Sequence, residues 1–300
     1  MNDMMICDVG MYLPKKILHN NDLPDSLDTN HEWIHQRTGI ETRRIAAENE
    51  TTGFMAYNAV KDMKFKNLKM IIVATSTPDV AFPSCASYLH QKLSESHGLC
   101  RNIMCFDVHD ACNGFVQTMD IALQYLNSFE EYSEVLIVGS ETMTKLIDWT
   151  DRGTAILFGD GAGSMLLNNS GKVLYKSSKS IPNYDSLNTS GNKINMNGRE
   201  VFKTAVRSFS EDVNNAMNNV GEIDWFVPHQ ANLRIIESVL KNTKLNEKSL
   251  IYNGNLYGNT SAASIPIAFH QEFSKMKKGH KILFSAFGAG LRGSSLCIQI

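Results

Sequence analysis

The hydrophobic positions of this 300-residue chain form two kinds of segment that alternate along the sequence. Short aliphatic runs, typical of buried strands, occur at 69–76, 134–140, 155–163, 164–169, 225–230 and 281–290. The intervening segments have apolar residues three and four positions apart, as helices do: 51–65, 86–94, 115–127, 201–220, 232–241 and 262–277. Strands that alternate with helices predict an α/β layered fold.

Two glycine-containing segments resemble each other and suggest an internal repeat. Both "AILFGDGAGSMLL" (155–167) and "ILFSAFGAGLRGSSLCI" (282–298) read as a strand, a glycine-rich turn and a second strand. Two duplicated halves would produce this echo, and so would two unrelated β-hairpins with glycine turns. The polar stretches 168–172 and 188–198 read as loops too short to be disordered linkers, so we expect the two halves to pack together.

The composition is that of a soluble globular protein, with 43% hydrophobic and 20% charged residues. The net charge of −2 creates no field that would attract nucleic acid or an anionic membrane. The first residues, "MNDMMICDVGMYLP", lack the basic segment of a signal peptide, and no stretch approaches the roughly 18 apolar residues that span a bilayer. We therefore expect a cytoplasmic protein that binds neither nucleic acid nor membranes.

The cysteines and glycines give no sign of a metal or nucleotide cofactor. No C-x-x-C pair or zinc-finger spacing occurs among the six cysteines, Cys7, Cys85, Cys100, Cys105, Cys112 and Cys297. In a reducing cytosol most of them should be small buried hydrophobes. The glycine run "FGDGAGS" (158–164) precedes a strand-like segment, whereas a dinucleotide fingerprint needs a helix there. The sequence therefore predicts chemistry without metal or cofactor.

Cys112 differs from the other cysteines because it directly precedes a predicted helix. Apolar residues mark one face of this helix, which should begin near Asn113: Phe115, Met119, Ala122, Leu123 and Leu126. The unpaired amides and the dipole of a helix start favour a thiolate, so this position is expected to lower the pKa of Cys112. The same amides could hold an oxyanion. Cys112 is thus a candidate nucleophile.

Two further polar residues gain meaning only in combination with Cys112. His229 follows a predicted strand in "VPHQANLRII" (227–236), and Asn259 lies in "YGNTSAAS" (257–264). Alone, His229 could be a surface or packing residue and Asn259 part of an ordinary turn and helix cap. A cysteine nucleophile in acyl transfer needs partners that polarise a carbonyl group. Together the three residues predict an acyl-transfer site.

Several of these segments resemble β-ketoacyl-acyl-carrier-protein synthase III, the condensing enzyme that starts bacterial fatty-acid synthesis. The resemblance begins at "YLPKKILHNNDL" and "DTNHEWIHQRTGIETRRIA" and covers nearly the whole chain. It is carried further by "DVHDACNGF", "DRGTAILFGDGAG", "VPHQANLRII", "GNTSAASIP" and "AFGAG". It implies a thiolase fold, in which two similar α/β halves form a five-layered αβαβα architecture. Residues 1–168 would carry the nucleophile, and residues 169–300 would carry the histidine and the asparagine.

The resemblance also implies the reaction. An acyl-CoA primer, acetyl-CoA or another short acyl-CoA, would load Cys112 and then condense with malonyl-acyl-carrier protein, which loses carbon dioxide, to give a 3-oxoacyl-acyl-carrier protein. Coenzyme A thioester would be the substrate, with no cofactor. One alternative is a related acyltransferase or condensing enzyme of a specialised pathway with another primer or acceptor. A thiolase using Cys297 as its base is disfavoured by the position of that cysteine, and a silent binding module by the presence of all three polar residues.

Roles for further residues follow from the resemblance alone. Coenzyme A would be held at its adenine and phosphates by Trp33, Arg37 and Arg152, and along its pantetheine arm by Gly198, Phe202 and Asn232. Arg234 would contact the carrier protein. The acyl pocket would comprise Leu157, Phe287 and, across a homodimer interface, Phe82, while the backbone of Cys112 and Ala289 would form the oxyanion hole. The alternatives are that Trp33 and Phe82 are core aromatics and that the arginines are solvated charges.

Three positions depart from the family pattern and leave substrate choice open. His109 and Asp110 precede the nucleophile where small residues are usual, and Arg292 lies in "GLRGSS" (290–295), which is one residue short. If the Asp110 carboxylate faced the thiol, it would raise the pKa of Cys112; if it points away, it would not.

Overall fold

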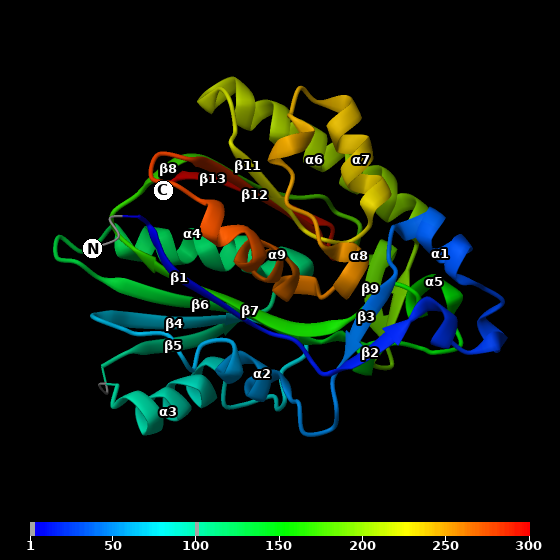
Figure 1. The fold of residues 1–300 in the computed structure, drawn as a ribbon, viewed down its shortest axis with the longest axis horizontal. Coiled ribbons are helices and arrows are strands. Elements are labelled where there is room, and N and C mark those ends of the chain that lie inside the picture. Colours follow the sequence, from blue (N-terminus) through cyan, green and yellow to red (C-terminus); the bar gives the residue numbers. More distant parts are fainter. Residues whose placement is uncertain (1–3, 100–101) are drawn as a thin grey trace.

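A computed structural model describes residues 4–99 and 102–300 of the chain, so Cys100 lies outside the described residues. Two large sheets dominate it (Figure 1). The first has the order β1-β7-β6-β4-β5, with β1 (Ile6–Tyr12), β4 (Leu68–Ala74), β5 (Met104–Val108), β6 (Glu134–Thr142) and β7 (Asp160–Asn168). The second has the order β11-β12-β13-β8, with β8 (Lys172–Ser180), β11 (Trp225–Pro228), β12 (Lys281–Gly288) and β13 (Arg292–Gln299).

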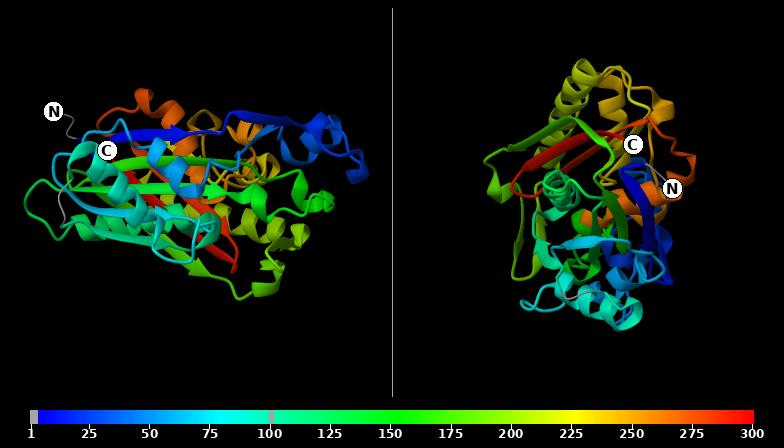
Figure 2. Two further views of the ribbon diagram at one scale, coloured as in Figure 1. Left: turned by 90° about the horizontal axis from the view of Figure 1, so that it is seen from below. Right: turned by 90° about the vertical axis from the view of Figure 1, so that its left-hand side faces the viewer.

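Helices lie on both faces of each sheet and complete five layers (Figures 1 and 2). The outer face of the first sheet is covered by α2 (Thr52–Asn58) and α3 (Cys85–His97). The outer face of the second is covered by α6 (Gly198–Val220) and α7 (Leu233–Asn242). Between the sheets lie α4 (Gly114–Leu126) and α9 (Ser264–Glu272). The predicted αβαβα architecture of the thiolase fold is confirmed.

The predicted apolar face of α4 forms much of the central core. Phe115 and Met119 are fully buried between the sheets, where they pack in one cluster with Phe269 of α9 and Phe284 of β12. This burial, together with the favourable spacing of apolar residues, explains why residues 114–126 form a helix in this layer. Within the described residues, no helix is long and apolar enough to cross a membrane.

The two sheets repeat one pattern of strand pairing, which supports two duplicated halves. In the first sheet β1–β7 and β7–β6 are antiparallel and β6–β4 is parallel. In the second sheet β8–β13 and β13–β12 are antiparallel and β12–β11 is parallel. A short 3-10 turn precedes each central helix, and the first residue of each turn has a positive φ, 46° at Ala111 and 50° at Ser261. Strands of the first sheet end at Asn168 and those of the second begin at Lys172.

The structure corrects the secondary structure predicted for the glycine run near residue 160. Residues 155–167 were expected to form a strand, a turn and a second strand, but β7 is one continuous strand that follows the short helix α5 (Arg152–Ala155). The hairpin β6–β7 is therefore the counterpart of β12–β13. The glycines serve close packing, since a Cβ on Gly163 would lie 2.7 Å from the backbone nitrogen of Ile267 in α9.

The hydrophobic pattern did not predict several short polar elements. They are β2 (Lys16–His19), β3 (Thr42–Ile45), α1 (His31–Thr38), α8 (Gly254–Tyr257), β9 (Leu187–Ser190) and β10 (Lys193–Met196). Residues 188–198 were expected to be a loop, but β9 and β10 pair as a hairpin. Local capping defines α1: the Asn30 side chain accepts a hydrogen bond from the Trp33 amide, and Gly39 ends the helix at a φ of 75°.

Candidate active site

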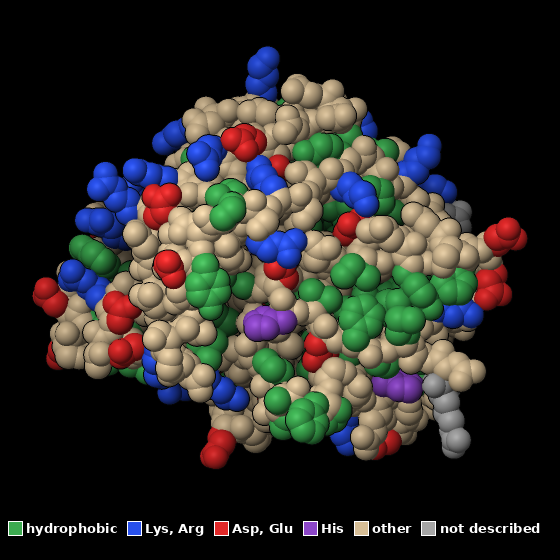
Figure 3. Space-filling view, turned by 180° about the vertical axis from the view of Figure 1, so that it is seen from behind, with side chains coloured by type: hydrophobic (Ala, Val, Ile, Leu, Met, Phe, Trp, Pro, Cys, Tyr) green, Lys and Arg blue, Asp and Glu red, His purple; other side chains and the backbone are tan. Residues whose placement is uncertain are grey.

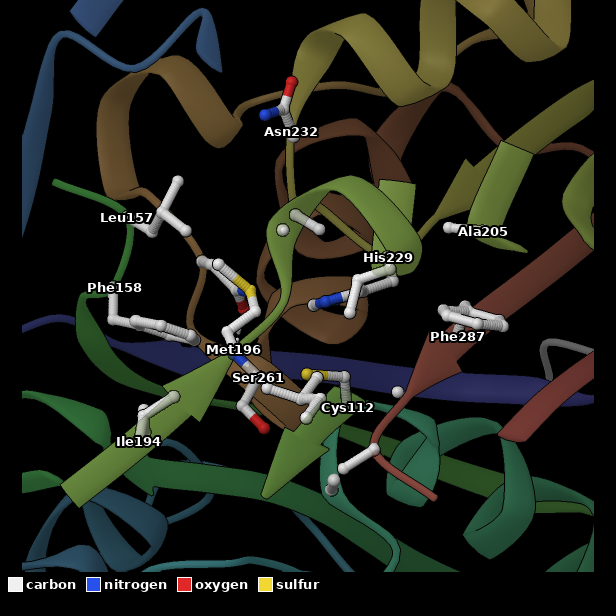
Figure 4. Close-up of a pocket in the computed structure, with 18 of the residues that line it drawn as sticks. Cys112, Leu157, Phe158, Ile194, Met196, Ala205, His229, Asn232, Ser261 and Phe287 are labelled. Atoms are coloured by element: carbon white, nitrogen blue, oxygen red, sulfur yellow. Dashed lines mark hydrogen bonds between the residues drawn. The ribbon is translucent and has the colours of Figure 1, made fainter. Parts of the chain in front are cut away.

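A cavity of about 810 Å³ lies between the two halves and collects most of the candidate residues. Cys112 comes from the first half, and His229 and Asn259 come from the second (Figure 4). All three side chains line the same space although they are far apart in the sequence. The structure thus brings together the triad that the sequence analysis selected.

Cys112 occupies the 3-10 turn directly before α4, as predicted, but its electrostatic environment differs from the prediction. The helix start was expected to lower the thiol pKa. Instead, burial raises the pKa of Cys112 to about 12, and contacts from Ser261 and Asn259 lower it by less. The expectation is wrong for the free protein because desolvation of the thiolate outweighs the favourable helix start. The thiol is therefore protonated at rest.

The imidazole of His229 is held as a neutral hydrogen-bond donor. Its backbone N–H donates to the Ser285 carbonyl (2.8 Å), and its Nδ1 lies 2.7 Å from the Ser264 hydroxyl at the start of α9. Ser264 Oγ also accepts a hydrogen bond from the Gln230 amide (3.3 Å), so its own proton is available to His229 Nδ1. This arrangement favours the tautomer with the proton on Nε2. Burial lowers the pKa of His229 to about 3, which keeps the ring uncharged.

Asn259 is fixed so that its amide nitrogen remains available as a donor. Its Oδ1 accepts a hydrogen bond from the Ser261 amide (2.8 Å), and its backbone N–H donates to the Leu157 carbonyl (2.9 Å). Gly159 in turn donates to the Asn259 carbonyl (3.0 Å). These backbone bonds join Asn259, in the second half, to the segment ahead of β7 in the first half. Contacts between the two halves therefore fix the position of the Asn259 side chain.

Trp33 and two arginines form a cluster at one end of the cavity. Trp33 and Arg37 line the cavity, and the Arg37 guanidinium lies 5.2 Å from the centre of the Trp33 ring. Arg152, outside the cavity lining, lies 4.8 Å from the same centre and donates to the Asp28 carbonyl (2.7 Å). Trp33 is only partly buried, so it is not a simple core residue. This local group of cations and one indole can stack on a planar base and bind phosphate.

The three residues expected along the pantetheine arm all line the cavity. Gly198 starts α6, Phe202 lies on its first turn, and Asn232 caps α7 by accepting a hydrogen bond from the Arg234 amide (2.9 Å). The Arg234 guanidinium is exposed and lies 5.8 Å from the centre of the Phe202 ring. Arg234 is thus outside the cavity but beside its wall.

The residues assigned to the acyl pocket fall in two places. Leu157 and Phe287 line the cavity, as does Ala289 of the expected oxyanion hole. In Figure 4, the Phe158 ring points toward Met196. Phe82 does not line the cavity of its own chain, and 85% of its surface is exposed. The alternative that Phe82 is a core aromatic is therefore wrong.

The open question about Asp110 is resolved by its partners. Its Oδ1 accepts a hydrogen bond from Arg292 Nη1 (3.1 Å), and its Oδ2 accepts one from Asn113 Nδ2. The carboxylate is thus engaged by Arg292 from β13, in the opposite half. His109, Asp110 and Arg292 all line the cavity, so the three departures from the family pattern occur in its wall.

Several cavity residues were missed by sequence reasoning. The hydrophobic ones include Met143, Phe158, Ile194 and Met196, and the polar ones include Ser76 and Ser261. Of these residues, Phe158 could have been predicted, because it directly follows Leu157 in the glycine-containing segment. The others come from short elements with no regular pattern. Across residues 4–99 and 102–300, no group of three or more His, Cys, Asp or Glu side chains could hold a metal ion.

Comparisons with known proteins agree with this geometry. The family model described as 3-Oxoacyl-[acyl-carrier-protein (ACP)] synthase III matches residues 106–181, and the model described as its C terminal matches residues 214–300. The chain is 40% identical to the Beta-ketoacyl-[acyl-carrier-protein] synthase III of Wolbachia pipientis wMel, with 100% of both chains covered.

Solved structures give the same result. The crystal structure of 3-oxoacyl-[acyl-carrier-protein] synthase III from Aquifex aeolicus VF5 is similar with a TM-score of 0.91, 37% identity and 99% of both chains covered. The β-ketoacyl-[acyl-carrier-protein] synthase III from Thermus thermophilus has a TM-score of 0.91 at 33% identity, again over 99% of both chains.

Proposed function

The chain belongs to the β-ketoacyl-[acyl-carrier-protein] synthase III family, and we propose that its cavity performs the condensation that initiates fatty-acid synthesis. The protein is an acyltransferase that joins an acyl-CoA primer to malonyl-acyl-carrier protein with loss of carbon dioxide. The observation that carries this proposal is the convergence of Cys112, His229 and Asn259 from both halves on one cavity.

In the first half-reaction Cys112 becomes acylated. Its sulfur attacks the thioester carbonyl of the acyl-CoA, and coenzyme A leaves. The backbone N–H groups of Cys112 and Ala289 would stabilise the oxyanion of the tetrahedral intermediate. Gly288 permits this approach, because a Cβ at that position would lie 3.0 Å from the Cys112 amide nitrogen.

In the second half-reaction His229 and Asn259 act as paired donors. His229 Nε2–H and Asn259 Nδ2–H would hydrogen-bond to the thioester oxygen of the malonyl group. As carbon dioxide departs, the electrons of the broken bond form an enolate, whose negative oxygen these donors stabilise. The enolate carbon attacks the acyl-Cys112 carbonyl, and the thiolate leaves. The sequence of steps uses no metal or redox cofactor, since coenzyme A enters as part of the substrate.

The substrates would enter past the cluster of Trp33, Arg37 and Arg152, with Gly198, Phe202 and Asn232 along the pantetheine arm. Guanidinium groups suit both the adenine face and the phosphates. Arg234 would contact the carrier protein. Lys and Arg side chains gather over the end of the molecule where α6 begins (Figure 3, upper left), and α6 has exposed cations four residues apart at Arg199, Lys203 and Arg207. This positive surface favours an acidic partner.

The proposal includes a cytoplasmic homodimer. Phe82, with 85% of its surface exposed, and Val80, with 55%, form an apolar projection that a second copy would cover. Leu157 and Phe287 line the cavity of their own chain, and Phe82 would then close the acyl pocket of the partner.

The direct test is a condensation assay with acetyl-CoA and malonyl-carrier protein. The expected product is a 3-oxobutanoyl-carrier protein with release of carbon dioxide and free coenzyme A. Competing a panel of acyl-CoAs in the same assay identifies the primer, which the departures at His109, Asp110 and Arg292 leave open. Acylation of Cys112 without condensation to any malonyl-carrier protein would instead support the alternative, a related enzyme of a specialised pathway with another acceptor.

A further inference from the structure

A second ionisable side chain, Glu141 at the end of β6, lies behind the nucleophile. It is fully buried, and in the described part of the chain it forms no ion pair. Its Oε2 accepts hydrogen bonds from the Ser76 amide (3.0 Å) and from Thr77 Oγ1 (2.6 Å). Its Oε1 is buried without a hydrogen-bond partner among the described residues. Because a buried carboxylate lacking a cation is costly, this residue requires a functional explanation.

The hydrogen bonds to Oε2 fix the carboxylate in one orientation. Thr77 Oγ1 accepts a hydrogen bond from the Thr142 amide (2.8 Å), so its own proton is directed to Glu141. A third donor, Thr75 Oγ1, lies 3.3 Å from the same oxygen. Since Oε2 is already surrounded by donors, Oε1 is the atom that can accept a proton.

The 3-10 turn that begins with Ser261 contacts both β6, which carries Glu141, and the 3-10 turn that holds Cys112. Ser261 opens this turn, which lies ahead of α9, with a φ of 50°, the counterpart of Ala111 in the turn that holds Cys112. Its hydroxyl is buried without a hydrogen-bond partner among the described residues, and it lowers the pKa of both Cys112 and Glu141 by less than burial raises them. Ser261 lines the cavity beside Cys112 (Figure 4). Glu141 Oε1 and Ser261 Oγ, one from each half, are thus buried oxygens without a hydrogen-bond partner on two elements that pack against each other.

We propose that Ser261 and Glu141 form the route by which the Cys112 thiol loses its proton during acylation. This inference rests on the proposed role of Cys112 as nucleophile. As Sγ forms its bond to the thioester carbon, its proton passes to Ser261 Oγ, and the Ser261 proton passes to Glu141 Oε1. Coenzyme A leaves with the electrons of the broken carbon–sulfur bond. The coenzyme A thiolate takes a proton from solvent. Glu141 holds the Cys112 proton until the Cys112 thiolate leaves in the condensation step, when the proton returns through Ser261 to Sγ and Glu141 is ionised again.

His229 is poorly suited to this task. With a pKa of about 3, its ring is a very weak base, and its Nδ1 is already bonded to Ser264. Burial raises the pKa of Glu141 to about 6, so the group is ionised at neutral pH but is a better base than an ordinary carboxylate. Proton transfer also neutralises Glu141, which removes the repulsion that adds to the effect of burial on the pKa of Cys112.

The other titratable groups around Glu141 do not compete for this role. Cys85 of α3 faces it from the other side of the sheet, where Asp107, Asp79 and Glu141 all add to the burial that raises the pKa of that thiol. Cys85 therefore stays protonated and uncharged. Of these two thiols, Cys112 is the one that lines the cavity.

The test compares the two half-reactions in Glu141→Gln and Ser261→Ala. We expect the single-turnover acylation of either variant by acetyl-CoA at neutral pH to be slower by about 100-fold, the usual contribution of a general base. In the wild-type protein this rate should rise as the pH passes about 6 and Glu141 ionises, and in Glu141→Gln that rise should be absent. Decarboxylation of malonyl-carrier protein, which needs no thiolate, should stay close to the wild-type rate.

Glu134→Gln is the matched control. Glu134 is a buried glutamate at the opposite end of the same strand, where its carboxylate accepts hydrogen bonds from the Lys66 amide (2.7 Å) and Tyr132 Oη (2.7 Å). This variant should be acylated at the wild-type rate. A Glu141→Gln protein with the wild-type rate and pH profile would overturn the inference, and so would equal losses in both half-reactions. Absence of acylation in the wild-type protein would instead refute the proposed function itself.

Discussion

At the scale of single residues, the sequence was enough to select the candidate nucleophile and its two proposed partners but not the residues that orient them. Cys112 was found from its place before a helix, and the resemblance gave His229 and Asn259 their roles. The bond from His229 to Ser264 joins residues 35 positions apart, and no local pattern predicts it. The predicted direction of the Cys112 pKa shift was wrong for a related reason. A helix start can be recognised in the sequence, whereas the desolvation of a side chain cannot.

His229→Ala and Asn259→Ala should cripple the decarboxylation of malonyl-carrier protein. Removing one preorganised donor to a developing negative charge typically costs about 100- to 1,000-fold in rate. Acylation of Cys112 should suffer less in Asn259→Ala, because that step uses backbone donors for its oxyanion. Measuring the two half-reactions separately checks this, and equal losses in both would point to a general structural defect.

The decarboxylation rate should also show no change near pH 6.5, the usual pKa of histidine. Burial lowers the pKa of His229 to about 3, so the neutral donor is lost only as the pH falls toward that value. The measurement is the rate of carbon dioxide release from malonyl-carrier protein between pH 5 and 8, in a Glu141→Gln background to remove that group's titration. A drop in rate as the pH falls through 6.5 would contradict the assignment.

Trp33→Ala and Arg152→Ala should weaken the use of acetyl-CoA by raising its KM. Both residues belong to the cluster expected to hold the nucleotide, far from the reacting carbon, so they act equally in the ground and transition states. A short acetyl thioester without the nucleotide should acylate both variants as fast as the wild type. Equal losses with both acyl donors would show that these residues support the fold or the cavity wall instead.

At the scale of secondary structure elements, the hydrophobic pattern found the long buried elements and missed the short polar ones. Strands β4 and β6 and helices α4, α6 and α7 lie close to their predicted ranges. The error at β7 arose because glycines were taken as a turn, although their purpose is to let α9 approach the sheet. That purpose depends on an element 100 residues later and is not visible locally. The β9–β10 hairpin was missed because its strands are short and largely exposed.

Gly163→Ala should lower the free energy of unfolding by about 1–3 kcal/mol, the usual cost of overpacking. Its Cβ would lie 2.7 Å from the Ile267 amide nitrogen and 2.9 Å from Pro266 Cβ, and a helix backbone cannot easily move aside. Gly161→Ala on the same strand is the control, since its Cβ would first meet the flexible end of the Ile267 side chain at 3.0 Å. Denaturant unfolding measures both, and an equal or larger loss for Gly161→Ala would contradict the packing argument.

At the scale of the whole molecule, the active site exists only where the two halves meet. The strand pairing shows that the halves repeat one design, and the turns at Ala111 and Ser261 occupy equivalent places in it. The sequence left duplication and chance similarity open for the echo, and the strand pairing supports duplication. The echo nevertheless set residues 155–167 against β12–β13, whose counterpart is β6–β7, because the repeat survives in backbone geometry more than in residue types. The five-layered fold was predicted through the family resemblance, since periodicity alone indicated only an α/β class.

The proposed homodimer makes a prediction at the scale of the whole molecule. Sedimentation velocity should show a dimer at assay concentrations, and Phe82→Ser should both weaken the dimer and slow acylation by altering the partner's acyl pocket. The physical reason is that the 85% exposed phenylalanine would be covered only on association. A monomer with full activity would refute this arrangement.

The central claim is that Cys112 carries the acyl group, and peptide mapping after incubation with acetyl-CoA tests it most directly. We predict one acetyl group per chain on the peptide that contains Cys112. Cys112→Ser should gain none and should remain folded, because the substitution nearly conserves volume. An acetyl group on Cys85, Cys105 or another residue in place of Cys112, or a wild-type protein that gains none, would contradict the account.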